Sequence, residues 1–197
     1  MVAASKNRPT IVRLMQRIRV PLGFVTAPLL FVLAKPTRHS LLAGALIAIC
    51  GVAIRGWASG HLRKNERLAT GGPYALTRNP LYLGTFVMGT GISICSGSLP
   101  FIIFFEVLYL AVYIPVMIAE ADTMRQLFPD GYGAYSRSVP LFLPRLTPAR
   151  LESTQPSSDT PETGFDLSLY LRHREYRAAI GAIIVIALLI LKSVYLK

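Results

Sequence analysis

Five long apolar stretches restrict what this chain can fold into more than any other feature. They span residues 20–34, 41–58, 81–95, 99–119 and 178–196. A helix of roughly 20 apolar residues crosses a bilayer, because it bonds all its backbone groups internally. The first and third stretches are shorter, so they need polar flanks or a tilt. With a mean hydropathy of +0.47, the sequence predicts an all-α, polytopic integral membrane protein with about five transmembrane helices.

The basic residues are distributed asymmetrically around these stretches. The formal net charge is +11. If the five helices alternate in direction, all but four of the 21 Lys and Arg residues lie on one side; the four are Lys35, Arg38, Lys192 and Lys197. The asymmetry places the N-terminus in the cytoplasm. Attraction to anionic membrane lipids accounts for the charge, so no nucleic-acid partner is expected.

The first stretch has a second interpretation as a signal peptide. Basic residues precede it, and it ends in the cleavage-like Val32-Leu33-Ala34. The charge asymmetry favours a retained helix. Cys50 and Cys95 lie within apolar stretches and resemble small buried hydrophobic residues. The His residues are scattered, so no metal site is predicted.

The sequence suggests three regions. Residues 1–146 form the membrane core, with the informative motifs in 55–146; residues 147–165 form a flexible linker, and 166–197 a final helix standing apart from the others. Two rows of small residues predict close helix packing. They are Gly44, Ala48, Val52 and Gly56, and Thr85, Gly89, Ser93 and Gly97.

A turn at 97–100 joins the third and fourth stretches into a hairpin in the C-terminal half. The fourth helix is expected to continue to about Gln126 and to break at Pro129, with 136–146 a loop or short amphipathic piece at the interface.

A polar segment at 71–84 marks the start of the third stretch. Asn79 fits the N-cap of a helix and Pro80 its first position. A helix start carries free N–H groups and a partial positive charge, and Arg78 adds a full one. This end of the hairpin is predicted to hold an anionic group.

Glu120 lies at the other inner end of the hairpin, and the hairpin brings it near Arg78. Membrane topology alone would explain Arg78 or Glu120 considered separately, and a belt of aromatic residues at the membrane interface would explain the tyrosines. Together they predict a cytoplasm-facing pocket for a zwitterion with an aromatic base. The nearby tyrosines are Tyr74, Tyr82, Tyr132 and Tyr135.

These residues resemble the integral membrane methyltransferases that include isoprenylcysteine carboxyl methyltransferase and the phospholipid N-methyltransferases. The resemblance covers residues 55–146 and two motifs in order across a hairpin. The matching residues are Gly72-Pro73-Tyr74, Asn79-Pro80-Leu81-Tyr82-Leu83-Gly84, Glu120, Phe128-Pro129-Asp130-Gly131-Tyr132-Gly133-Ala134-Tyr135 and Val139-Pro140.

The resemblance implies S-adenosylmethionine as the cofactor and a lipophilic acceptor from the bilayer. It places Tyr74, Asn79, Pro80, Leu81, Tyr82 and Glu120 at cofactor-contacting positions, with Glu66, Arg67, Leu68 and Ala69 just upstream. Arg78 and the helix start would hold the methionine carboxylate, and Glu120 the ammonium or ribose. Arg78 and Glu120 are thus the candidate catalytic residues.

Two departures from the family pattern affect the expected substrate. Pro129 replaces a usual Gly, and Val116 stands where prenylcysteine enzymes carry an Arg one turn before the Glu. The second change argues against a prenylcysteine acceptor. Two other functions stay open: an NADPH-dependent reductase like the membrane sterol reductases, which share an Arg-x-x-x-Tyr-x-Gly hairpin, and a non-catalytic membrane scaffold.

Overall fold

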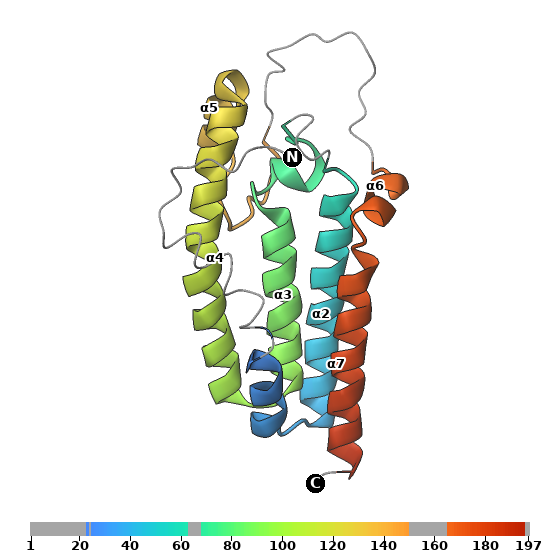
Figure 1. The fold of residues 1–197 in the computed structure, drawn as a ribbon. Coiled ribbons are helices and arrows are strands. Elements are labelled where there is room, and N and C mark those ends of the chain that lie inside the picture. Colours follow the sequence, from blue (N-terminus) through green and yellow to red (C-terminus); the bar gives the residue numbers. More distant parts are fainter. Residues whose placement is uncertain (1–22, 24, 63–67, 150–164, 196–197) are drawn as a thin grey trace.

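The computed structural model describes residues 23, 25–62, 68–149 and 165–195, and within them the fold is all-α, as predicted. Residues 25–33 are helical and precede seven further elements (Figure 1). These are α2 (Arg38–Ser59), the 3-10 helix η1 (Gly72–Ala75), α3 (Pro80–Cys95), α4 (Leu99–Leu127), α5 (Pro129–Ser138), α6 (Leu167–Arg172) and α7 (Tyr176–Tyr195).

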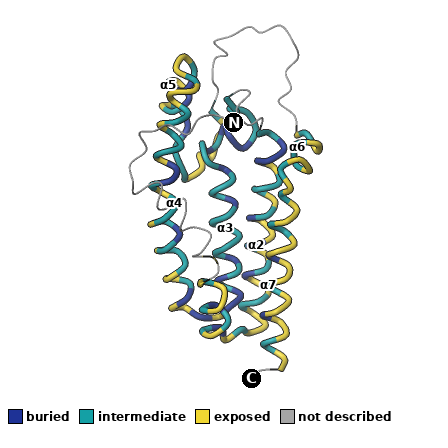
Figure 2. Tube along the Cα trace, in the orientation of Figure 1, coloured by how far each residue is buried: buried dark blue, intermediate teal, exposed yellow. Residues whose placement is uncertain are grey.

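Three of the helices are long and apolar enough to cross a membrane. They are α2 with 22 residues, α4 with 29 and α7 with 20. They coincide with the predicted stretches 41–58, 99–119 and 178–196. α3 is apolar but has only 16 residues. Large apolar side chains cover the outer faces of the long helices, where a bilayer would solvate them (Figure 2).

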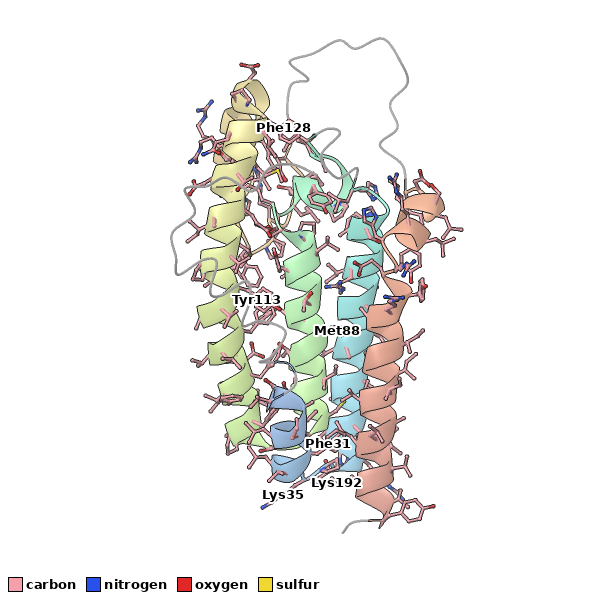
Figure 3. The ribbon with its side chains drawn as sticks, viewed as in Figure 1. Phe31, Lys35, Met88, Tyr113, Phe128 and Lys192 are labelled. Carbon is pink, nitrogen blue, oxygen red and sulfur yellow. The ribbon has the colours of Figure 1, made fainter. Side chains whose placement is uncertain are left out.

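Glycines allow α2 and α3 to pack backbone against backbone. A Cβ at Gly51 would lie 2.6 Å from Cα of Met88, and a Cβ at Gly91 would lie 2.6 Å from O of Gly44. Met88 lies between the two helices in Figure 3. The predicted row on α2 is confirmed at Gly44 and Ala48, both buried. The predicted row on α3 meets two neighbouring helices, because Gly89 lies against Phe105 of α4 and Thr85 contacts Arg55 of α2.

α3 and α4 are joined by a tight turn at residues 96–98. Gly97 has a φ of +65°, a left-handed conformation that favours glycine. Aromatic rings lie between the two helices: the Tyr82 and Tyr113 centroids are 5.4 Å apart, and Tyr113 stacks on Tyr109 at 4.2 Å (Figure 3). α4 continues through Pro115 to Leu127, one residue past the predicted end.

Residues 129–138 form helix α5, whereas the sequence predicted a loop or short amphipathic piece from 136. Phe128 separates α5 from α4, so the predicted break before Pro129 is confirmed. Residues 139–149 then lie along 75–79, with Arg145 N–H donating to Leu76 O at 2.9 Å.

The last helix does not stand apart from the others. α7 lies beside α2 (Figure 1) and also contacts α3. Leu189 is fully buried beside Leu30, and Lys192 Nζ donates to Phe31 O at the same end of the molecule (Figure 3). α7 therefore belongs to the same helical assembly. Most of the predicted linker 147–165 lies outside the described residues.

Candidate active site

The start of α3 has the predicted residues in the predicted positions. Asn79 is the N-cap residue and buried Pro80 is the first helical residue. The Asn79 side chain does not cap the helix. Its Nδ2 donates to Leu141 O at 2.9 Å and fixes the 139–149 segment. The side chain of Asn79 therefore leaves the N–H groups of the first turn of α3 uncapped.

Arg78 lies directly before this helix start. Its backbone N–H donates to Pro140 O at 2.9 Å, and its Nη1 donates to the Tyr132 hydroxyl at 3.0 Å. The guanidinium also faces the Tyr132 ring, 5.9 Å from the centroid. Its Nε is buried and has no hydrogen-bond partner among the described residues. A buried donor of this kind is costly unless a ligand accepts from it.

Tyr82 and Glu120 form the second part of the site. The Tyr82 hydroxyl donates to Glu120 Oε1 at 2.8 Å and ties the first turn of α3 to α4. A hydrogen bond to a carboxylate is stronger than one between neutral groups and fixes the orientation of the carboxylate. Tyr82 and Glu120, which the sequence assigned to the two arms of the hairpin, are thus in direct contact.

Tyr74 and Leu68 pack beside α5. Tyr74 is buried in η1, and its carbonyl accepts a hydrogen bond from the Tyr135 hydroxyl at 2.8 Å. Leu68 packs against Tyr132 and Tyr135. Burial raises the pKa of Tyr74, and the nearby Tyr135 and Glu175 raise it further. Tyr74 is therefore neutral at physiological pH.

Two other predicted residues have less definite surroundings. Ala69 is half-buried next to Leu68 and lies outside helices. Leu81 follows Pro80 in the first turn of α3, where its carbonyl accepts from Thr85 Oγ1 at 2.8 Å. Glu66 and Arg67 lie outside the described residues.

Sequence reasoning missed the polar contacts of two charged residues inside the apolar helices, Arg55 and Glu106. Arg55 of α2 contacts Thr85 of α3 and pairs with Glu175 before α7. Glu106 of α4 accepts a hydrogen bond from Thr90 Oγ1 at 2.6 Å. A charged residue within an apolar helix was the available signal, because such residues need a partner in a bilayer.

The arrangement combines an anion-binding and a cation-binding group. Arg78 and the start of α3 favour an anion, and Glu120 favours a cation or a hydroxyl group. Both flank the first turn of one helix. Such a pair fits a zwitterionic small molecule. Among the described residues, no group of three or more His, Cys, Asp or Glu side chains is arranged to hold a metal ion.

Comparison with known proteins agrees with this arrangement. Residues 41–131 match the family model of the phospholipid methyltransferases. No solved structure matches the chain significantly.

Two curated relatives carry names that refer to metal resistance. The cobalt-zinc-cadmium resistance protein CzcN of Cupriavidus metallidurans is 32% identical over 149 residues, which are 69% of this chain and 66% of that protein. The nickel-cobalt-cadmium resistance protein NccN of Alcaligenes xylosoxydans xylosoxydans is 34% identical over 92 residues, which are 47% of this chain and 43% of that protein. The chain thus spans only part of each relative. The match covers most of α2 and all of α3 and α4, and it confirms the predicted resemblance to the membrane methyltransferases over residues 41–131.

Proposed function

We propose that the chain is a membrane-bound methyltransferase that uses S-adenosylmethionine and methylates a lipophilic acceptor. The observation that carries this proposal is the placement of two complementary groups at the start of α3. Arg78 has a buried, unpartnered Nε, and Glu120 is held by Tyr82. A ligand with a carboxylate and an ammonium group complements both.

Each residue has a definite role in this proposal. Arg78 and the first turn of α3 bind the methionine carboxylate, and Glu120 binds the ammonium or a ribose hydroxyl. Tyr132 and Tyr82 orient these two side chains through their hydroxyls. Tyr74 is buried in η1, and its carbonyl is bonded by Tyr135.

This chemistry asks the protein mainly for positioning. The sulfonium of the cofactor supplies an already activated methyl group. The protein has to align the acceptor atom with that methyl group and exclude water, which contributes much of the rate enhancement in such displacements. A site without a metal cluster or a Ser-His-Asp arrangement is compatible with that requirement.

The acceptor is proposed to be a membrane molecule with its polar head at the interface. Val116, which replaces the Arg of the prenylcysteine enzymes, is fully buried. An anionic acceptor head next to it would lose hydration without gaining a counter-ion. An amine-headed phospholipid or an isoprenoid with an uncharged head fits better. The described residues offer no metal-ligand cluster to support a direct part in metal resistance.

The charge asymmetry supports a site on the cytoplasmic side, with the N-terminus cytoplasmic. An NADPH-dependent reductase remains the second candidate, because the Arg78, Tyr82 and Gly84 spacing also fits the sterol reductase hairpin. A non-catalytic scaffold would not require an oriented Glu120 or an unpartnered Arg78 Nε.

Calorimetry of the detergent-purified chain separates these candidates. We expect saturable binding of S-adenosylhomocysteine and no binding of NADPH. Glu120→Ala should weaken the first interaction, whereas Asp122→Ala should not, since Asp122 is an exposed carboxylate two residues along the same helix and bonds Arg125. Binding of NADPH alone would contradict the proposal and support a reductase. Binding of neither compound would support a scaffold.

A further inference from the structure

Arg55 forms an ion pair that joins two distant parts of the chain. Its Nη2 and Nε lie 2.6 Å and 3.0 Å from Glu175 Oε2. The two side chains are only 20% and 13% exposed. Glu175 is the residue before α7, and Arg55 lies in the last two turns of α2. The pair therefore fixes the start of the C-terminal helix to the body of the molecule.

The remaining donor of Arg55 reaches the first two turns of α3. Its Nη1 lies 3.4 Å from Leu81 O and contacts Thr85 Oγ1. Thr85 Oγ1 in turn donates to Leu81 O at 2.8 Å. Leu81 directly precedes Tyr82, whose hydroxyl orients Glu120. One guanidinium thus touches both Glu175, the residue before α7, and the helix turn that carries the candidate site.

Gly84 makes this approach possible. A Cβ at Gly84 would lie 2.7 Å from Cγ of Arg55 and 2.9 Å from its backbone N. Any larger residue would displace Arg55 or separate α2 from α3. The glycine that ends the 79–84 motif thus leaves room for the guanidinium stem.

Glu175 also acts on the site electrostatically. Burial is the main cause that raises the pKa of Tyr74, Tyr135 is the second, and the charge of Glu175 contributes as well.

We propose that Arg55 and Glu175 are positioning residues that couple the C-terminal helix to the cofactor end of α3. The inference rests on the proposed function in one respect only, which is the identity of the cofactor that binds at this end of α3. Glu175 holds the guanidinium in place, and the guanidinium holds Leu81 and Thr85, which sets the direction of the first turn of α3. Without Glu175, a buried Arg55 loses its counter-charge and leaves this position.

The test uses two variants and a matched control of the full chain in detergent. Glu175→Gln removes the counter-charge, and Thr85→Val removes the side-chain contact of Arg55 with α3 without removing any charge. Lys192→Met is the control, because it deletes the contact of α7 with Phe31 at the opposite end of that helix. Glu175→Asp keeps the charge and should restore part of any loss.

Two readouts separate this inference from the proposed function. Hydrogen exchange of the backbone amides of residues 83–86 needs no ligand. We expect it to become at least tenfold faster in Glu175→Gln and in Thr85→Val, and to stay unchanged in Lys192→Met. Calorimetry should show S-adenosylhomocysteine binding weakened at least tenfold in the same two variants, again without a change in the control.

Each outcome decides between the alternatives. Unchanged exchange in both test variants overturns the inference, even if the parent chain binds S-adenosylhomocysteine. An equal effect in Lys192→Met also overturns it, since α7 would then act only through general stability. If exchange is faster in the two test variants but the parent chain binds no S-adenosylhomocysteine, the positioning role is supported and the proposed cofactor is refuted. If Glu175→Gln does not fold, Thr85→Val and Glu175→Asp decide the result.

Discussion

Tyr82 presents its hydroxyl to Glu120 and its ring to Tyr113. Tyr82→Phe removes the hydroxyl and keeps the ring. A hydrogen bond to a charged group contributes about 1.5–3 kcal/mol. We therefore expect S-adenosylhomocysteine to bind roughly tenfold or more weakly by calorimetry, because a released Glu120 no longer has a fixed orientation. Tyr113→Phe, which keeps the stacked ring next to Tyr82, should bind as the parent does. Unaltered binding in Tyr82→Phe would remove Glu120 from the site.

The residues at the start of α3 could be found from sequence because their chemistry is local. Asn79 and Pro80 occupy neighbouring positions with known helix-start preferences. The side-chain bond of Asn79 was not predictable, because its partner Leu141 lies 62 positions away. Arg55 and Glu175 are 120 positions apart. Their pairing depends on how α2 and α7 pack and rotate, which local patterns do not determine.

The close packing of α2 against α3 leads to a prediction about how much this contact between the two helices contributes to stability. A Cβ at Gly91 would lie 2.6 Å from Gly44 O and 2.8 Å from Cα of Ala48, both rigid backbone. Gly91→Ala should lower the free energy of unfolding by about 1–3 kcal/mol, a typical cost of overpacking. Gly181→Ala on α7 is the control, because a Cβ there meets nothing within 4 Å. Thermal unfolding in detergent measures both variants. Equal unfolding temperatures would show that α2 and α3 can separate at little cost.

Helices could be predicted from the sequence where apolar residues form continuous runs, and they could not be predicted where such runs are absent. α2, α4 and α7 follow directly from long apolar runs. α5 contains Gly131 and Gly133, which disfavour a helix. Its tyrosines stabilise it through tertiary contacts with Leu68 and with the Tyr74 carbonyl. Such contacts between distant segments override local propensity, and the sequence pattern does not contain them.

At the scale of the whole molecule, we expect the site and its apolar surroundings to select the acceptor. A prenylcysteine carboxylate would meet the buried Val116 in place of the Arg of the prenylcysteine enzymes. We expect little or no methyl transfer to N-acetyl-farnesylcysteine and clear transfer to an amine-headed phospholipid or an uncharged isoprenoid, followed with radiolabelled S-adenosylmethionine in vesicles. Val116→Arg is unsuitable as a gain-of-function test, since it would place a charge at a fully buried position. Efficient turnover of the farnesylcysteine compound by the parent chain would contradict this reasoning.

The orientation of the molecule in the membrane is the broadest prediction. The basic residues predict that α5 and the candidate site lie in the cytoplasm and the turn before α2 outside. In a background with Cys50→Ser and Cys95→Ala, Lys35→Cys and Asp130→Cys each introduce one exposed thiol. A membrane-impermeant maleimide should label Lys35→Cys in intact cells and Asp130→Cys only after permeabilisation. The reverse pattern would place the site outside the cytoplasm, where S-adenosylmethionine is not supplied, and would count against the proposed activity as well as against the topology.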